Sequence, residues 1–261
     1  MKRRAGAVGA GGFLRSVRLV RDEVPSFDGY PFSIPAVRAL DELELDPKCT
    51  FFVGENGSGK STLLEAIAIT VGFNAEGGSK NFAFSARKSE SELTKYLRVA
   101  RGARRERDGF FLRAEAFFNA ATHIEELDRE REGRKIIDSY GGKSLHEQSH
   151  GESFLALAQH RFGGNGLYLL DEPEAALSPA RQLSFLTIMH ELLERNGSQM
   201  LIATHSPLLL AYPGARIVHF GHAGLVPIAY EDTEHFQLTR DFLNARERYF
   251  KHLFGAEGES D

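Results

Sequence analysis

The stretch Gly54-Glu55-Asn56-Gly57-Ser58-Gly59-Lys60-Ser61 decides the fold of this 261-residue chain. It satisfies the pattern G-x-x-x-x-G-K-S/T, and it lies between a short β-rich run at 49–53 and a helix-length apolar segment at 61–71. In this order of strand, loop and helix, the glycines let backbone N–H groups wrap a phosphate at the start of the helix. The sequence therefore predicts a phosphate-binding loop.

The side chains of this loop suit a nucleotide with its metal ion. Lys60 can reach the β- and γ-phosphates, and Ser61 can ligate Mg²⁺. The alternative, a chance glycine-rich turn, does not explain the strand before the loop or the helix after it. We expect these residues to bind nucleotide: Gly54, Glu55, Asn56, Gly57, Ser58, Gly59, Lys60, Ser61 and Thr62.

A second motif is the apolar strand Leu167-Tyr168-Leu169-Leu170, which ends in two carboxylates, Asp171 and Glu172. In ATPases with such a loop, an Asp at this place holds the Mg²⁺ shell, and the next Glu can polarise the attacking water. The alternative is a buried strand followed by an acidic helix cap, with Pro173 as the first helical residue. Because the motif follows a phosphate loop, we expect Asp171 and Ser61 to be metal ligands. We expect Glu172 and Lys60 to be catalytic.

The order and spacing of five elements resemble the ABC ATPase family, in particular its soluble branch of SMC-like and RecF-like proteins and the small predicted bacterial ATPases of AAA type. The resemblance spans about residues 32–213. It implies ATP and Mg²⁺ as ligands and a head-to-tail homodimer with ATP between two copies. The elements are the loop at 54–61, Ser149-His150-Gly151-Glu152, the strand ending at 171–172, Ala176-Leu177-Ser178-Pro179 and Thr204-His205-Ser206-Pro207.

By this resemblance, Ser149, Gly151 and Glu152 would contact the γ-phosphate bound to the other subunit, at the start of a helix over 153–162. The familiar transporter form is Ser-Gly-Gly-Gln, from which His150 and Glu152 depart. The alternative is a plain helix N-cap, with Ser149 and Glu152 as a capping box. The two interpretations are compatible because a helix start binds anions.

His205 follows an apolar strand at 200–203, where family members place a histidine that contacts the γ-phosphate. A lone histidine is more often an ordinary polar residue. The end of a strand in a parallel sheet is, however, where ligands collect. We therefore expect a catalytic role for His205.

Two family features have no clear counterpart. The glutamine expected to complete the metal shell is missing from 73–93, and Asn81, Ser85 or water are the candidates. Tyr30 or Phe32 would stack on adenine, or either is an ordinary core aromatic.

Composition and charge limit the class of protein and its partners. The chain is 42% hydrophobic and 26% charged, as globular domains are, and its net charge of −4 gives no global attraction to nucleic acid or anionic lipid. The only cysteine, Cys49, excludes an intramolecular disulfide and suits a reducing cytosol. The apolar runs are too short for a membrane span. We expect a cytoplasmic protein with one domain over 1–261, a disordered start at 1–12 and an acidic tail at 255–261.

Five arginines gather between residues 98 and 107. They could bind nucleic acid phosphates or an acidic partner. We favour a solvated hairpin tip instead, because Glu106 and Asp108 are interspersed and the whole chain is acidic.

Strands that alternate with helices predict a largely parallel sheet. The resemblance implies an α/β fold of the ABC ATPase type, a P-loop NTPase with a mainly parallel core sheet, an antiparallel β subdomain and a helical signature region. The other elements expected are an edge-type strand at 14–21, an irregular loop at 72–93, an aromatic strand at 109–118, a helix at 122–134, one helix at 179–195, a hairpin turning at 221–224 and a closing helix at 238–254.

The expected chemistry is hydrolysis of ATP by attack of water on the γ-phosphate. The process that it drives stays open, as does the protein client. DNA maintenance or defence is slightly favoured, although no long insert lies between 61 and 149. The alternatives are the ATP-binding subunit of a membrane transporter and a nucleotide-gated binding module with little turnover.

Overall fold

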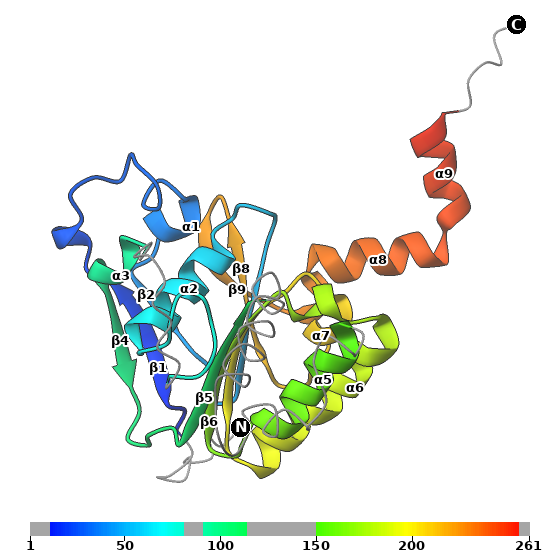
Figure 1. The fold of residues 1–261 in the computed structure, drawn as a ribbon. Helices are drawn as coiled ribbons and strands as arrows, with labels where there is room; N and C mark the ends of the chain where they lie inside the picture. Colours follow the sequence, from blue (N-terminus) through cyan, green and yellow to red (C-terminus); the bar gives the residue numbers. More distant parts are fainter. Residues whose placement is uncertain (1–10, 81–90, 114–149, 256–261) are drawn as a thin grey trace, which may run out of the picture.

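The computed structural model describes residues 11–80, 91–113 and 150–255. Among them, six strands form a central sheet of order β5-β6-β7-β3-β8-β9 (Figure 1). The strands are β3 (Cys49–Val53), β5 (Asp108–Arg113), β6 (Gly166–Asp171), β7 (Gln199–Ala203), β8 (Arg216–Gly221) and β9 (Gly224–Ile228). The first five pair in parallel, and β9 returns antiparallel to β8 through a turn at His222 and Ala223. The predicted mainly parallel sheet and late hairpin are confirmed.

Both faces of the central sheet are covered, because successive side chains of a buried strand point to opposite sides. Phe52 packs in one core cluster with Leu63 and Leu64 of α2 (Lys60–Thr70). Phe51 packs in the other with Phe154 of α5 (His150–Arg161) and Phe185 of α6 (Pro179–His190). Figure 1 shows α2 on one side of the sheet and α5 and α6 on the other.

A smaller antiparallel sheet covers α2 from outside, in the order β2-β1-β4. Its strands are β1 (Leu14–Leu19), β2 (Glu42–Glu44) and β4 (Leu97–Arg101). The prediction of an edge-type strand at 14–21 is therefore wrong, since β1 is paired on both sides. Its alternating pattern comes from a sheet with one buried face: Val17 is in the core, whereas Arg18 is exposed.

The buried side chain of Gln199, at the start of β7, joins the two sheets. Its Oε1 accepts a hydrogen bond from Leu14 N at 2.8 Å, and its Nε2 donates to Leu14 O and to Asp46 O, both at 2.8 Å. The amide thus satisfies three backbone groups of the smaller sheet and the β2–β3 connection.

Replacing Gln199 with leucine is expected to lower the free energy of unfolding by about 3 kcal/mol or more, because three backbone groups lose their partner. Urea denaturation followed by circular dichroism measures the loss. The matched control is Gln237→Leu on the surface, where Nε2 donates to Glu231 O, and which should change stability by about 0.5 kcal/mol or less. Equal effects of the two variants would contradict the role given to Gln199.

Two long helices expected from the sequence are each divided. After α6 the chain continues as a π-helical turn, Glu191–Arg195. The closing helix is two helices, α8 (Glu234–Asn244) and α9 (Arg246–Phe254), which separate at Ala245 with φ −142° and ψ 40°. Figure 1 shows α8 and α9 leading away from the body as an arm. No glycine or proline stands near Ala245, so the sequence offers no signal for the break.

The arginine-rich segment is a link between the two sheets and not a hairpin, because β4 pairs with β1 whereas β5 pairs with β6. Three of its five arginines have partners within the chain. Arg98 pairs with Glu23 at 3.1 Å, and Arg101 with Glu106 at 3.0 Å. Arg104 donates to Asn165 Oδ1 at 2.6 Å. This segment is therefore part of the packing between elements.

The remaining short helices complete the described chain. They are α1 (Pro35–Arg38), α3 (Leu93–Tyr96), α7 (Pro207–Leu210) and the 3₁₀ turns Arg21–Glu23, Pro173–Ala176 and Tyr230–Asp232. The expected strand at 109–118 is seen as β5 up to Arg113, and the expected helix at 122–134 lies outside the described residues. No helix within the described ranges is long and apolar enough to cross a membrane.

Candidate nucleotide site

The phosphate loop joins the end of β3 to the start of α2, and its shape requires glycine. Gly54 has φ +147° and Gly59 has φ +99°, both in the left-handed region. A Cβ at Gly54 would lie 2.4 Å from Phe220 O, and one at Gly59 would lie 2.8 Å from the Ile34 side chain. The loop therefore holds its backbone in a form that other residues cannot adopt, as a cradle for phosphate requires.

Lys60 lies at the first position of α2 and its side chain turns back over the loop. Its Nζ donates to Gly54 O and Glu55 O, both at 2.9 Å. Burial lowers the pKa of the Lys60 ammonium, and the nearby carboxylates of Glu172 and Asp171 oppose that shift. A buried ammonium among backbone N–H groups fits the β- and γ-phosphates of a nucleotide.

One hydrogen bond joins the two predicted metal ligands, Ser61 at the start of α2 and Asp171 at the end of β6. Ser61 Oγ donates to Asp171 Oδ1 at 2.8 Å, although the residues are 110 positions apart. Burial raises the pKa of the Asp171 carboxyl to about 6, against the opposing effects of Ser61 and Arg113. One hydroxyl and one carboxylate suit Mg²⁺, which takes its other ligands from phosphate and water. In the described part of the chain, no three His, Cys, Asp or Glu side chains form a metal cluster of their own.

Arg113 is a site residue that sequence reasoning missed. It ends β5, the strand beside β6, so its side chain lies next to the metal carboxylate. Its Nη1 is 2.9 Å from Glu65 Oε2 and its Nε is 3.9 Å from Asp171 Oδ2. The signal that could have found it is the strand order, which brings the end of β5 beside the end of β6. A guanidinium has no acceptor atom, so Arg113 does not replace the missing metal ligand. Asn81 and Ser85, the candidates from 73–93, lie outside the described residues.

Glu172 follows Asp171 in an unusual backbone conformation, with φ +51° and ψ +51°. A non-glycine residue in the left-handed region is uncommon and costs about 1–3 kcal/mol, a strain that is frequent at functional sites. The Glu172 N–H donates to Ala203 O at 2.9 Å. The carboxylate is partly exposed, and its Oε1 is 3.8 Å from His205 Nε2. The carboxyl ends of β6 and β7 thus bring two of the three predicted catalytic residues, Glu172 and His205, together.

Glu174 is a second acidic residue of the site that the sequence interpretation did not single out. Its carboxylate accepts a hydrogen bond from His205 N at 2.5 Å. Burial raises the pKa of the Glu174 carboxyl. The available signal was its place two residues after Glu172, in the short turn that Pro173 begins. Glu174 fixes the end of β7, and hence the backbone of His205.

The segment at 176–179 is tied to the segment at 204–207 by one buried side chain, Gln182. Its Nε2 donates to Leu177 O at 3.1 Å, and its Oε1 accepts from Ser206 Oγ. Ser206 also caps α7, since its Oγ accepts from Leu208 N and Leu209 N. Two of the five family-like segments are therefore held in fixed relation.

The signature-like residues lie on the face of the sheet that carries α5 and α6. The helix begins at His150, before the expected residue 153. A Cβ at Gly151 would lie 2.7 Å from the Arg181 side chain and 3.0 Å from Ala176 O, and Glu152 pairs with Arg181 at 2.9 Å. These contacts are with α6 and the 176–179 segment of the same chain. Ser149 lies outside the described residues.

The two aromatic residues proposed to stack on adenine differ in their exposure to solvent. Phe32 is buried and packs edge-to-face against Phe27 and Tyr96, so it is a core aromatic. Tyr30 is 72% exposed, and its hydroxyl is 3.4 Å from Thr62 Oγ1 at the start of α2. Tyr30 therefore remains the candidate for a stacking contact.

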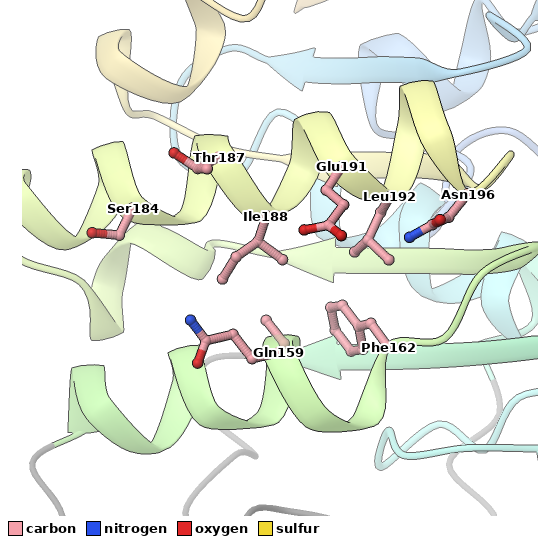
Figure 2. Close-up of a pocket in the computed structure, with 9 residues that line it drawn as sticks. Gln159, Phe162, Ser184, Thr187, Ile188, Glu191, Leu192 and Asn196 are labelled. Carbon is pink, nitrogen blue, oxygen red and sulfur yellow. The ribbon is translucent and has the colours of Figure 1, made fainter.

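A surface hollow of about 440 Å³ lies between α5 and α6. Figure 2 shows Gln159 and Phe162 of α5 opposite Ile188 and Glu191. The hollow belongs to the face opposite α2, so it is separate from the phosphate loop.

A phosphate loop between β3 and α2, with its serine bonded to the aspartate that ends a neighbouring parallel strand, defines a P-loop NTPase fold. With its antiparallel sheet and helical α5–α6 layer, the fold is of the ABC ATPase type. Two family models agree with this class. Residues 33–156 match a model described as an AAA domain, and residues 144–211 match one described as an AAA domain, putative AbiEii toxin, type IV TA system. Residues 33–156 and 144–211 of the chain are thus each similar to an AAA domain.

Several solved structures resemble the chain at low identity. A putative metal-chelate type ABC transporter is 16% identical, with 87% of each chain covered and a TM-score of 0.49. The SMC head domain from Thermotoga maritima is 15% identical, with 83% of this chain and 99% of that one covered and a TM-score of 0.45. A dimeric ATP-binding cassette bound to ADP and Pi is 18% identical, with 74% and 91% covered and a TM-score of 0.44. Likenesses this distant add nothing on activity or assembly, and the comparison with curated proteins found no match.

Proposed function

We propose that this chain binds ATP with Mg²⁺ and hydrolyses it by attack of water on the γ-phosphate. The observation that carries the proposal is the hydrogen bond from Ser61 to Asp171, because it brings the end of the phosphate loop and the end of β6 to one point. Lys60, Glu172 and His205 lie around that point.

Each side chain has a separate task in this proposal. Lys60 would leave the carbonyls of Gly54 and Glu55 and donate to the β- and γ-phosphate oxygens. Ser61 and Asp171 would hold Mg²⁺, which when bound neutralises charge on those oxygens. Lys60 then stabilises the charge that develops in the transition state.

Glu172 would accept the proton of the attacking water, and His205 would donate a hydrogen bond to the γ-phosphate. Glu172 is suited to this because its carboxylate is partly exposed and therefore open to water. His205 is suited because its Nε2 is buried and has no hydrogen-bond partner among the described residues. Glu174 acts through His205, whose backbone N–H it binds.

The active species in this proposal is a homodimer with two equivalent ATP sites. Gly151 lies against Arg181 and Ala176 O, and Glu152 pairs with Arg181, so the start of α5 packs on α6 of its own chain. In this proposal, residues 149–152 serve the nucleotide that a partner binds. Two identical half-sites that complete each other give a twofold dimer. Among the processes that such a dimer could drive, the description of the second matched model, a putative toxin, favours defence.

Release of phosphate from ATP tests the proposal directly. The purified chain should hydrolyse ATP with Mg²⁺ and lose the activity when the metal is chelated. Absence of turnover together with normal ATP binding would instead support the nucleotide-gated binding module.

The arginines at 98–107 are not expected to make this chain a nucleic-acid-binding protein, because Arg98, Arg101 and Arg104 already have internal partners. A fluorescence titration of duplex and single-stranded DNA at two salt concentrations should give no binding tighter than about 10⁻⁴–10⁻⁶ M, the range of non-specific contacts. A tight complex that weakens steeply with salt would contradict this expectation.

A further inference from the structure

His235, in the first turn of α8, contacts the candidate site although it belongs to none of the motifs. Its Nε2 lies 3.0 Å from Nδ1 of His205, and the two ring centroids are 5.1 Å apart. The C-terminal arm thus begins with a residue that is hydrogen-bonded to a predicted catalytic side chain.

The start of α8 is firmly anchored, so the position of His235 is fixed by structure. The buried Thr233 caps the helix: its hydroxyl donates to Tyr230 O at 2.7 Å and accepts from Phe236 N. The ring of Tyr230 packs against Phe236, and its hydroxyl donates to Pro207 O at 3.0 Å, two residues after His205. These contacts tie the first turn of α8 to the segment that carries His205.

When both histidines are neutral, their contact has only two possible arrangements of protons. Burial lowers the pKa of His205 and of His235, and the neighbouring Lys60 adds to both shifts. A neutral imidazole has one N–H and one bare nitrogen. Either His235 Nε2–H donates to His205 Nδ1, or His205 Nδ1–H donates to His235 Nε2.

The surroundings of His205 Nε2 select the first arrangement. This nitrogen is buried, and Glu172 Oε1 lies 3.8 Å away. A bare lone pair facing a carboxylate is repulsive, whereas an N–H in the same place is attracted. The other charged or titratable groups near the pair are Lys60, Glu174, Glu234 and His219. Of these, Lys60 disfavours an N–H on Nε2, and its effect on the pKa of His205 is larger than the opposite effect of Glu172. The Lys60 ammonium, however, donates to Gly54 O and Glu55 O, whereas the Glu172 carboxylate faces Nε2 directly at 3.8 Å.

We propose that His235 is a positioning residue whose Nε2–H donates to Nδ1 of His205. It thereby holds His205 in the tautomer that carries its proton on Nε2, facing Glu172. The second part of the inference rests on the proposed function: this Nε2–H is the donor to the γ-phosphate, which has acceptors only. The arm would then complete the site of its own chain.

The tautomer of His205 can be measured without any substrate. In the full chain with ¹⁵N-labelled histidine, long-range ¹H–¹⁵N correlation spectra distinguish a proton on Nε2 from one on Nδ1, and His205→Gln assigns the signals. We expect the proton on Nε2 in the wild-type protein. We expect the same in His235→Gln, whose amide can still donate, and a mixture of tautomers in His235→Leu.

A proton on Nδ1 of His205 in the wild-type protein would overturn the inference, and so would an unchanged tautomer in His235→Leu. If His235→Leu does not fold, the wild-type spectrum and His235→Gln decide alone. This measurement stays valid even if the chain hydrolyses no ATP, so failure of the proposed function is recognised separately.

The rate of ATP hydrolysis tests the second part of the inference, in which His205 Nε2–H donates to the γ-phosphate. His235→Leu should reduce kcat about 3- to 10-fold, as loss of one hydrogen bond does, with little change in the affinity for ADP, which lacks the γ-phosphate. His235→Gln should restore kcat to within about 2-fold. His252→Leu, an exposed histidine on α9 of the same arm, is the matched control and should change nothing. In a His205→Ala background, His235→Leu should cause no further loss, and a full additional loss would contradict the coupling.

Discussion

Glu172→Gln is expected to reduce turnover about 10²–10⁴-fold while leaving the affinity for ATP unchanged. The amide cannot accept the proton of water, but it keeps the size of the side chain and the backbone conformation at φ +51° that aims it. Steady-state phosphate release and equilibrium binding of ATP measure the two effects separately. Turnover within 10-fold of wild type would show that another group is the base, and the nearest alternative is Glu174.

The same variant should trap ATP and so hold two copies together. With ATP and Mg²⁺, Glu172→Gln should run as a dimer in light-scattering chromatography and as a smaller species without nucleotide. Adding Ser149→Arg should abolish this dimer, because a bulky cation replaces a γ-phosphate ligand at the helix start. Ser26→Arg, at an exposed serine elsewhere, is the matched control and should leave the dimer intact. If the Ser149 double variant still dimerises on ATP, residues 149–152 are only a helix cap.

Lys60→Ala should weaken ATP binding by about 100-fold or more, because the ammonium is the main charge that compensates the β- and γ-phosphates. Titration with a labelled ATP analogue measures the loss. Lys48→Ala is the matched control: Lys48 is a surface lysine paired with Glu194, and its loss should leave ATP affinity unchanged. Circular dichroism of Lys60→Ala separates lost binding from lost folding, because Gly54 O and Glu55 O also lose a donor. Unchanged affinity in a folded variant would contradict the assignment of 54–61.

The sequence predicted the elements around the phosphate loop because their signals are local. A glycine pattern between a short apolar run and a helix defines the loop by itself, and the strand expected at 200–203 is seen as β7, Gln199–Ala203. The carboxyl ends of parallel strands lie at one edge of the sheet. Because each comes just after such a strand, that edge is where the sequence predicted Asp171, Glu172 and His205.

The remaining site residues depend on tertiary packing, which no local pattern records. Arg113 reaches Asp171 only because β5 pairs with β6, and His235 reaches His205 only because α8 returns to the end of β7. The pattern of β1 showed a half-buried strand, but it could not show that β1 has a partner on each side. Similarly, the arm bends at Ala245, where the residue types would allow a continuous helix.

The hydrogen bonds of the Gln199 amide affect local unfolding at the start of β1. Its three hydrogen bonds attach Leu14 and Asp46 to the strand at the centre of the larger sheet. The first residue of a strand normally frays, and its N–H exchanges with solvent through small local fluctuations. Here the Leu14 N–H is released only when the Gln199 side chain also moves. We therefore expect slow hydrogen exchange at Leu14 N–H, and faster exchange there in Gln199→Leu.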